Sequence, residues 1–192
     1  MNSMQSRWCI NFVSLIAICA LLPGCSFMRT GGKPPLSTVS QVDLPRYMGH
    51  WRVIAEIPYF GERDDVDSVE SYALLPDGTI YNWFVARKGS FSGPETKVTA
   101  HAYVFDKQSN AEWRVKFLSG LLTAPYLIID LDPDYQWTVV GHPTRNFGWI
   151  MARRKTMPEA TYQAILKRVA TQGYDISRFQ KVPQVPSEMP GH

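Results

Sequence analysis

One cysteine stands where its thiol could be chemically modified. Cys25 follows Leu22-Pro23-Gly24 at the end of an apolar stretch that begins at Trp8, and Arg7 is the only charge before it. A positive residue, an apolar centre and small residues at the end are typical of a cleaved secretory signal. The stretch is shorter than the ~20 residues that a membrane span needs. Because a small residue directly before cysteine resembles the bacterial lipobox, we expect cleavage after residue 24 and diacylglycerol on Cys25.

Acyl chains at this cysteine would hold the protein on a membrane. Each buried methylene contributes ~0.8 kcal/mol, and two or more chains anchor a protein where one lets it dissociate. Ser26 follows the cysteine, where an aspartate would indicate retention in the inner membrane. We therefore expect a lipid-anchored protein of the outer membrane whose domain faces the periplasm. An uncleaved anchor and ordinary secretion are the alternatives.

The other patterns that could carry chemistry do not form a catalytic or metal site. Gly89-Ser90-Phe91-Ser92-Gly93 resembles a hydrolase elbow, but an aromatic residue occupies the position of the nucleophile. Asp130, Asp132 and Asp134 have the spacing of calcium ligands, but Tyr135 replaces the required glycine. The four histidines lack metal-ligand spacing. We therefore expect no enzyme activity, no metal and no cofactor.

Composition narrows the function classes further. Loss of residues 1–24 removes one positive charge, so the net charge of +3 falls by one, which is too little to favour nucleic acid. Cys9 and Cys19 are lost with the signal, which leaves Cys25 as the only cysteine. An intramolecular disulfide is therefore excluded. The remaining chain is long enough for one domain that is stabilised by its own core.

The elements that would position a site begin after residue 42. Residues 25–42 are rich in Ser, Thr, Gly and Pro and are expected to form a flexible tether. The Pro-rich residues 182–192 are expected to form a disordered tail. Between them, runs rich in β-branched and aromatic residues alternate with turn residues. These runs predict strands at 50–57, 68–75, 79–87, 97–105, 112–118, 125–131, 136–141 and 147–153.

The short connections favour an all-β fold, an eight-stranded antiparallel up-and-down barrel in which closure removes the exposed edges. One α-helix follows the strands. Residues 156–159 fit a capping box with proline in the first turn, and Gly173 is a plausible stop. The apolar residues between them form a single stripe, so we expect the helix to pack outside the barrel. These residues are Tyr162, Ile165, Leu166 and Val169.

Alternation along the strands assigns the inner face of the barrel. Val53 and Ala55 share a face with Trp51 in the first strand, and Val115 and Phe117 share one in the fifth. Eight strands enclose space for side chains and one small ligand. The expected ligand-binding residues are Val53, Ala55, Tyr72, Ala102, Trp113, Val115, Phe117, Tyr126 and Ile128.

Four features leave alternatives open. Strand 79–87 carries large apolar groups on both faces, so its inward face is not assigned. The acidic residues from Glu62 to Asp67 favour a solvated loop over a lid that senses a head group. Tyr59 and Phe60, just before that loop, suit either packing or contact with an acyl chain. The interior itself could be hollow or filled by packed side chains.

Three stretches resemble the lipocalin family. Gly49-His50-Trp51 resembles the family's first motif, Asp132-Pro133-Asp134-Tyr135 the second, and Arg153 the arginine of the third. The resemblance covers residues 43–181. It is closest to the bacterial outer-membrane lipoprotein lipocalins, whose kin include apolipoprotein D and plant temperature-induced lipocalins. The resemblance implies that Arg153 lies across Trp51 at the closed end of the barrel, in a structural role.

The resemblance also implies a function. A fatty acid or lysophospholipid would be bound in the barrel and stored or transported during membrane maintenance or stress, without covalent chemistry. The alternative is an envelope adaptor whose barrel is filled and whose surface docks other proteins. The sequence leaves open whether two copies form a homodimer.

Overall fold

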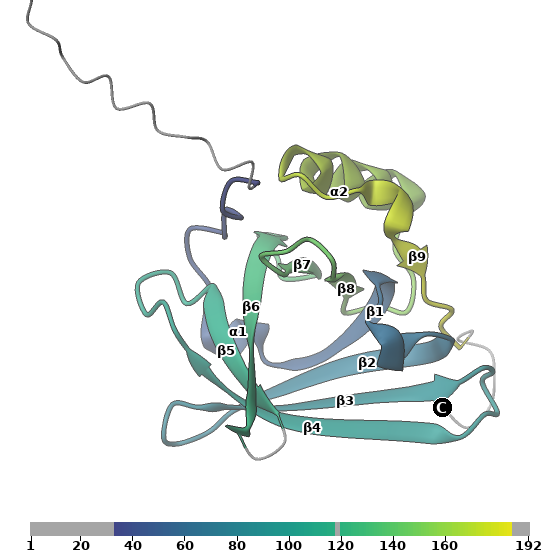
Figure 1. Cartoon of the computed structure of the whole chain (residues 1–192), viewed down its shortest axis with the longest axis horizontal. Coiled ribbons are helices and arrows are strands. Elements are labelled where there is room, and N and C mark those ends of the chain that lie inside the picture. Colours follow the sequence, from purple (N-terminus) through teal and green to yellow (C-terminus); the bar gives the residue numbers. More distant parts are fainter. Residues whose placement is uncertain (1–32, 118–119, 186–192) are drawn as a thin grey trace, which may run out of the picture. The chain divides into compact units, whose positions relative to one another are not determined.

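The computed structural model describes residues 33–117 and 120–185, so the predicted signal and Cys25 lie outside the described residues. The described residues form one compact unit. Its centre is a closed antiparallel barrel of eight strands, which confirms the predicted fold (Figure 1). The elements are α1 (Leu44–Tyr47), β1 (Gly49–Ile57), η1 (Phe60–Glu62), β2 (Asp65–Leu74), β3 (Ile80–Lys88), β4 (Glu95–Val104), β5 (Glu112–Phe117), β6 (Leu122–Leu131), β7 (Trp137–Gly141), β8 (Gly148–Ala152), α2 (Glu159–Thr171), η3 (Ile176–Arg178) and β9 (Gln180–Lys181).

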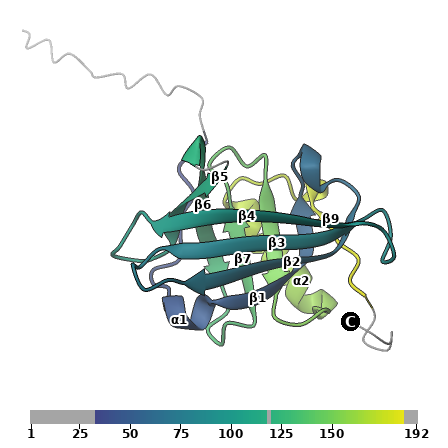
Figure 2. The same ribbon diagram turned by 90° about the horizontal axis from the view of Figure 1, so that it is seen from below.

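Consecutive strands pair around the barrel, and β1 pairs with both β8 and β2, which closes the sheet. The turn between β2 and β3 shows how the sequence directs this pairing. Asp77 Oδ1 accepts hydrogen bonds from the backbone N–H and the hydroxyl of Thr79, and Gly78 adopts a φ of +80°. That backbone conformation is accessible to glycine without steric cost. Figure 2 shows α1 at the end of the barrel opposite to the β3–β4 loop.

The inward face of β3, which the sequence left unassigned, is settled by burial. Ile80, Phe84 and Ala86 pack in the core inside the barrel. Tyr81 and Trp83 are only half-buried on the outer face, where their rings stack with centroids 5.5 Å apart. Both faces of β3 are therefore apolar because the outer face carries an aromatic pair of its own.

The closed end of the barrel is formed by α1 and the residues that resemble the three lipocalin motifs. Gly49 has a φ of +91°, which leads the chain from α1 into β1. Trp51 is fully buried, and its indole N–H donates to the carbonyl oxygen of Tyr47. The guanidinium carbon of Arg153 lies 3.7 Å from the centroid of the Trp51 ring. These residues cover one end of the barrel.

A second core lies between the barrel and α2, which lies outside the barrel as predicted (Figure 1). The predicted stripe is buried there: Tyr162, Ile165, Leu166 and Val169. The predicted capping box is wrong, because the helix begins at Glu159 and Pro158 occupies the N-cap position without a side-chain hydrogen bond. Gly173 has a φ of +85°, just after the helix ends, as expected for a stop.

The predicted tether is wrong for residues 33–42, which pack along the barrel. Val42 is fully buried, and its N–H donates to the carbonyl oxygen of Ser109. The N–H of Val39 donates to the carbonyl oxygen of Ile128. Composition predicted a flexible tether because the segment contains Pro and Ser. Composition does not show that the backbone N–H groups of this segment find acceptors on the barrel.

The predicted disordered tail is also wrong for residues 182–185. Val182 and Val185 are buried, and the Gln184 amide donates to the carbonyl oxygens of Val53 and Ser68. The second half of β1 pairs with β9 instead of β2. The C-terminal segment therefore bridges β1 and β2 where these two strands no longer pair.

Candidate ligand-binding cavity

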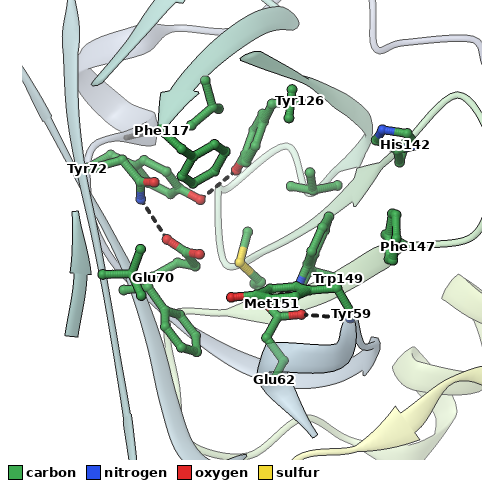
Figure 3. Close-up of a pocket in the computed structure, with 16 residues that line it drawn as sticks. Tyr59, Glu62, Glu70, Tyr72, Phe117, Tyr126, His142, Phe147, Trp149 and Met151 are labelled. Carbon is green, nitrogen blue, oxygen red and sulfur yellow. Dashed lines mark hydrogen bonds between the residues drawn. The ribbon is translucent and has the colours of Figure 1, made fainter. Parts of the chain in front are cut away.

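A cavity of about 350 Å³ opens at the end of the barrel opposite to α1. One part of its wall comes from η1 and the β7–β8 loop, which contribute Glu62, His142 and Phe147, and the rest comes mainly from the strands (Figure 3). This volume is near the lower limit of the range of ligand pockets. The residues that line it are Tyr59, Glu62, Glu70, Tyr72, Asn82, Phe84, Val98, Val115, Phe117, Ala124, Tyr126, Val140, His142, Phe147, Trp149 and Met151. The barrel is therefore hollow at this end and not filled by its own side chains.

Four of the nine expected ligand-binding residues line the cavity: Tyr72, Val115, Phe117 and Tyr126. Four others belong to the packed core inside the barrel and are not among the lining residues: Val53, Ala102, Trp113 and Ile128. The alternation placed them correctly inside the barrel, but the closed end is filled by aromatic rings. Trp113 lies in that filled part, fully buried and 5.4 Å from the Tyr47 ring.

The expected facing of Ala55 is wrong. The register between β1 and β8 shifts between Val53 and Ala55, which marks a β-bulge. An extra residue in one strand reverses the faces of all residues beyond it. Ala55 therefore packs under α2 in the second core, and Glu56 turns to the inside of the barrel.

A chain of phenol hydroxyls forms the floor of the cavity. Tyr126 Oη donates to Tyr72 Oη at 2.8 Å, and Tyr47 Oη lies 2.9 Å from Tyr126 Oη. The Trp113 and Tyr126 rings stack with centroids 4.8 Å apart. Burial raises the pKa of all three tyrosines, so they remain protonated at neutral pH. The floor supplies hydroxyl groups to a ligand but no base.

Glu62 enters the cavity because η1 folds back over the barrel. Its carboxylate accepts hydrogen bonds from the Trp149 indole N–H at 3.2 Å and from the backbone N–H of Tyr59 at 3.3 Å. The side chain is buried, and the sequence-based expectation of a fully solvated acidic loop is wrong at this position. Burial, reinforced by the nearby Glu56, raises the pKa of Glu62 to about 9.

Glu70 and Glu56 extend the acidic side of the interior. Glu70 lies on β2 opposite Trp51 and Phe84, and its carboxyl points into the cavity (Figure 3). The Asn82 amide donates to it at 2.6 Å, while burial raises its pKa to about 7. Glu56 lies opposite Trp149 in the β1–β8 pairing, so both side chains face inward. Burial and the neighbouring Asp65 raise the pKa of Glu56 to about 8.

Positive charge is scarce around these acids. The lining residues include neither Lys nor Arg. Lys88 lies nearby, but its ammonium donates to the carbonyl oxygens of Gly61 and Arg63 and lies 2.5 Å from Asp65 Oδ1. Two of the three ammonium donors are therefore used by backbone carbonyls, and the charge of Lys88 is paired with that of Asp65. Burial lowers the pKa of His142, which is therefore neutral at physiological pH.

Neither a metal site nor a membrane-spanning helix is found in the parts of the chain that the structure describes. Among residues 33–117 and 120–185, no three acidic, histidine or cysteine side chains are grouped to hold a metal ion. Within the same ranges, no helix combines the length and apolar character that crossing a membrane would require. The cavity is the candidate functional site of the described residues.

Comparison with known families agrees with the fold and the cavity. A family profile described as a Lipocalin-like domain matches residues 42–184, which is most of the chain. The chain is a lipocalin. Lipocalins generally bind small hydrophobic ligands, which is the use that the cavity suggests. The family match ends beside Gln184 and thus includes the C-terminal segment that bridges β1 and β2.

Individual relatives confirm the subgroup that the motifs indicated. Temperature-induced lipocalin-1 of Arabidopsis thaliana is 34% identical over 164 residues, which cover 79% of this chain and 84% of the relative. Outer membrane lipoprotein Blc of Escherichia coli K12 is 30% identical over 156 residues, which cover 79% and 85%. Among solved structures, insecticyanin of the tobacco hornworm Manduca sexta superposes with a TM-score of 0.62 at 16% identity. That superposition covers 78% of this lipocalin and 84% of insecticyanin, and it shows the fold.

Sequence reasoning missed cavity residues whose side chains are turned inward by an irregularity of the backbone. Glu56 is turned inward by the bulge, and Glu62 by η1, and alternation predicts neither. Glu70 had a usable signal, because it lies two residues before Tyr72 on the same face of β2. Trp149 and Met151 share the inner face of β8 by the same rule.

Proposed function

We propose that this lipocalin is anchored to a bacterial outer membrane through Cys25 and carries or stores a single-chain lipid in its cavity. The ligand would be a fatty acid or a lysophospholipid, handled during membrane maintenance or stress. The observation that supports this function is the hollow end of the barrel, with apolar groups on several sides and an opening for the ligand. Its volume corresponds to about a dozen liquid water molecules at ~30 Å³ each. It suits one chain and is too small for two.

Physical chemistry supports binding without catalysis. Transfer of a chain from water into the cavity contributes about 25 cal/mol for each Å² of apolar surface that is removed from water. The tyrosines of the floor remain protonated. The imidazole of the neutral His142 is hydrogen-bonded to the hydroxyl of Thr144 at 2.9 Å, and this hydroxyl is exposed and not among the groups that line the cavity. The alternative of an adaptor with a filled barrel is disfavoured, because the interior has room for a ligand.

Ligand binding is tested with the barrel domain, residues 33–192, which contains the closed sheet and both cores. We expect lipid extraction and mass spectrometry of the purified domain to identify a single-chain lipid. A fluorescent fatty acid should bind the domain, and Val115→Asp should abolish binding. Lys116→Asp, which changes the adjacent outward side chain, is the control. A domain that carries no lipid and binds no probe would contradict the proposal.

Anchoring is tested separately. We expect Cys25→Ser to release the protein from the membrane fraction, whereas Cys19→Ser in the predicted signal should leave it there. Mass spectrometry of the mature N-terminus should show diacylglycerol on Cys25. Density-gradient separation of the two membranes tests the outer-membrane location, and protease protection tests the periplasmic orientation. Sedimentation of the purified domain tests whether two copies form a homodimer.

A further inference from the structure

The acids of the cavity form one wall instead of being dispersed around it. Glu62 from η1 and Glu70 from β2 both line the cavity, and Glu56 from β1 lies on the inner face opposite Trp149. Glu56 and Glu62 are only 3% and 4% exposed, so their acid groups are withdrawn from bulk water. Apolar side chains from the other strands surround this wall. A buried polar group without a hydrogen-bond partner is costly, and a buried charge is more so, so this arrangement requires an explanation.

The hydrogen-bonding capacity of these acids is not used up within the described residues. An ionised carboxylate offers about four acceptor sites. Glu70 receives side-chain donation from the Asn82 amide alone, and Glu62 receives two N–H groups. Glu56 Oε2 is buried without a hydrogen-bond partner among the residues that the structure describes. The wall therefore has several acceptor sites that face the interior and lack donors.

Among the residues that the structure describes, no Lys or Arg lines the cavity beside Glu62 and Glu70, although Lys88 is near enough to Glu56 to lower its pKa. Lys88 is engaged by Asp65 and by two backbone carbonyls, as described above. The remaining titratable groups near Glu62 and Glu70 are the carboxyls of Glu56 and Asp65, the imidazole of His142, and the phenols of Tyr47, Tyr59, Tyr72 and Tyr126. Burial raises the pKa of Tyr59 to about 12, so this phenol stays neutral. Within the described ranges no cation remains for Glu62 and Glu70, so a ligand would have to supply the positive charge.

We propose that the cavity selects a hydrophobic amine, a ligand with one apolar chain or ring and a protonated ammonium group that is bound by Glu62 and Glu70. The ammonium group would donate to the free acceptor sites of both carboxylates, and the apolar part would pack against Val115, Phe117 and their neighbours. This inference rests on the proposed function and refines it. It favours a lysophospholipid whose head group carries an ammonium over a free fatty acid, whose carboxylate would add a negative charge to an acidic wall.

The protonation of the cavity acids makes the inference measurable. The raised pKa values of Glu62 and Glu70, about 9 and about 7, mean that these acids hold protons over part of the neutral range. A bound ammonium stabilises the ionised form, so amine binding near pH 7.5 should release protons to the buffer. A bound carboxylate requires protonated acids, so fatty acid binding should take protons up or leave them unchanged. The two ligand classes therefore differ in the sign of proton exchange.

The test compares three ligands of equal chain length: decylamine, decanoate and decanol. Isothermal titration of the barrel domain at pH 7.5 in two buffers of different ionisation enthalpy gives the affinity and the number of protons exchanged. We expect decylamine to bind at least about tenfold more tightly than decanoate, with net proton release; tenfold corresponds to about 1.4 kcal/mol. Glu70→Gln should weaken decylamine binding by about tenfold or more and leave decanol binding unchanged.

Control variants separate electrostatic from structural effects. Glu62→Gln should act as Glu70→Gln does, and Glu95→Gln, an equal change at an exposed position of β4, should have no effect. Circular dichroism of each variant checks that the barrel is intact. If decanoate binds as tightly as decylamine, or if the glutamine variants keep their affinity for the amine, the inference is wrong while the proposed function stands. If none of the three ligands binds, the proposed function itself is wrong.

Discussion

The Arg153 guanidinium lies over the Trp51 indole, with 3.7 Å between the guanidinium carbon and the ring centroid. The same guanidinium donates to the carbonyl oxygens of Arg46 and His50, at 2.7 and 2.9 Å. It thus satisfies backbone acceptors on both sides of Met48, where α1 leads into β1. The Arg153 side chain therefore links α1, which covers the closed end of the barrel, to the start of β1.

We expect Arg153→Lys to destabilise the domain by about 2 kcal/mol. A lysine has no planar fork to reach both carbonyls and a weaker cation–π contact with Trp51, and hydrogen bonds from charged groups contribute ~1.5–3 kcal/mol. Urea unfolding followed by tryptophan fluorescence measures the change. Arg154→Lys is the matched control, because Arg154 is exposed. Equal stability of both variants would show that the Arg153 contacts do not stabilise the closed end.

The buried acids should make stability fall as pH rises through the neutral range. The pKa of an unfolded glutamate is ~4.3, and those of Glu56 and Glu62 in the barrel are about 8 and about 9. The unfolded chain therefore releases protons that the folded domain keeps, so their contribution is complete below pH 4 and is lost towards pH 9. We expect Glu56→Gln and Glu62→Gln to flatten this dependence, which urea unfolding between pH 5 and 9 measures.

The pH dependence of the unfolding free energy has an upper limit. Each carboxyl contributes at most ~1.4 kcal/mol for each pH unit between its unfolded and folded pKa. Glu95→Gln, on an exposed position, should leave the slope unchanged. A wild-type stability that is constant or rises from pH 6 to pH 9 would mean that Glu56 and Glu62 are not protonated in the folded domain.

The C-terminal segment should contribute to stability despite its composition. Deletion of residues 182–192 removes buried Val182 and Val185 and the Gln184 hydrogen bonds to Val53 and Ser68. We expect a loss of about 3–5 kcal/mol, since burial of each valine contributes ~1.5–3 kcal/mol. Deletion of residues 186–192 alone keeps all of these contacts and should change stability by less than ~0.5 kcal/mol. Thermal unfolding of both truncated proteins distinguishes the two cases.

A cavity-filling substitution should block the ligand without unfolding the barrel. Ala124 lines the cavity near the start of β6, and Ala124→Phe would place a ring in the space for the chain. We expect binding of a fluorescent fatty acid to fall by at least about tenfold. Thr123→Phe adds the same ring on the exposed face of β6 and should leave binding intact. If Ala124→Phe binds normally, the ligand occupies another site.

Regular features of the fold could be predicted from the sequence. Hairpin turns such as the one at Asp77 and Gly78 depend on local chemistry, and α2 follows from one apolar stripe. Local patterns of this kind act over a few residues and need no knowledge of the rest of the chain. The structure accordingly confirms the strand order, the closed barrel and the outer helix.

The candidate site was predicted only in part, because it depends on places where the strands depart from regular alternation and pairing. One extra residue at the bulge moves Ala55 out of the barrel and Glu56 into it. The tilt and packing of whole strands decide how much of the interior is filled, so Trp113 lies in the packed end and Val115, two residues on, lines the cavity. Neither effect has a signature in the alternation of apolar and polar residues.

The bridge that the C-terminal segment makes between β1 and β2 has a consequence for the order of assembly. Gln184 contacts Val53 and Ser68, which precede it by 131 and 116 positions. Contacts between such distant positions form slowly, because a long loop must close before they add stability. The side of the barrel that bears Glu56 thus receives contacts from residues that leave the ribosome after all eight strands of the barrel. Until then β1 and β2 are not bridged beside the acidic wall of this lipocalin. A chain whose synthesis stops before residue 182 would keep that gap in the barrel.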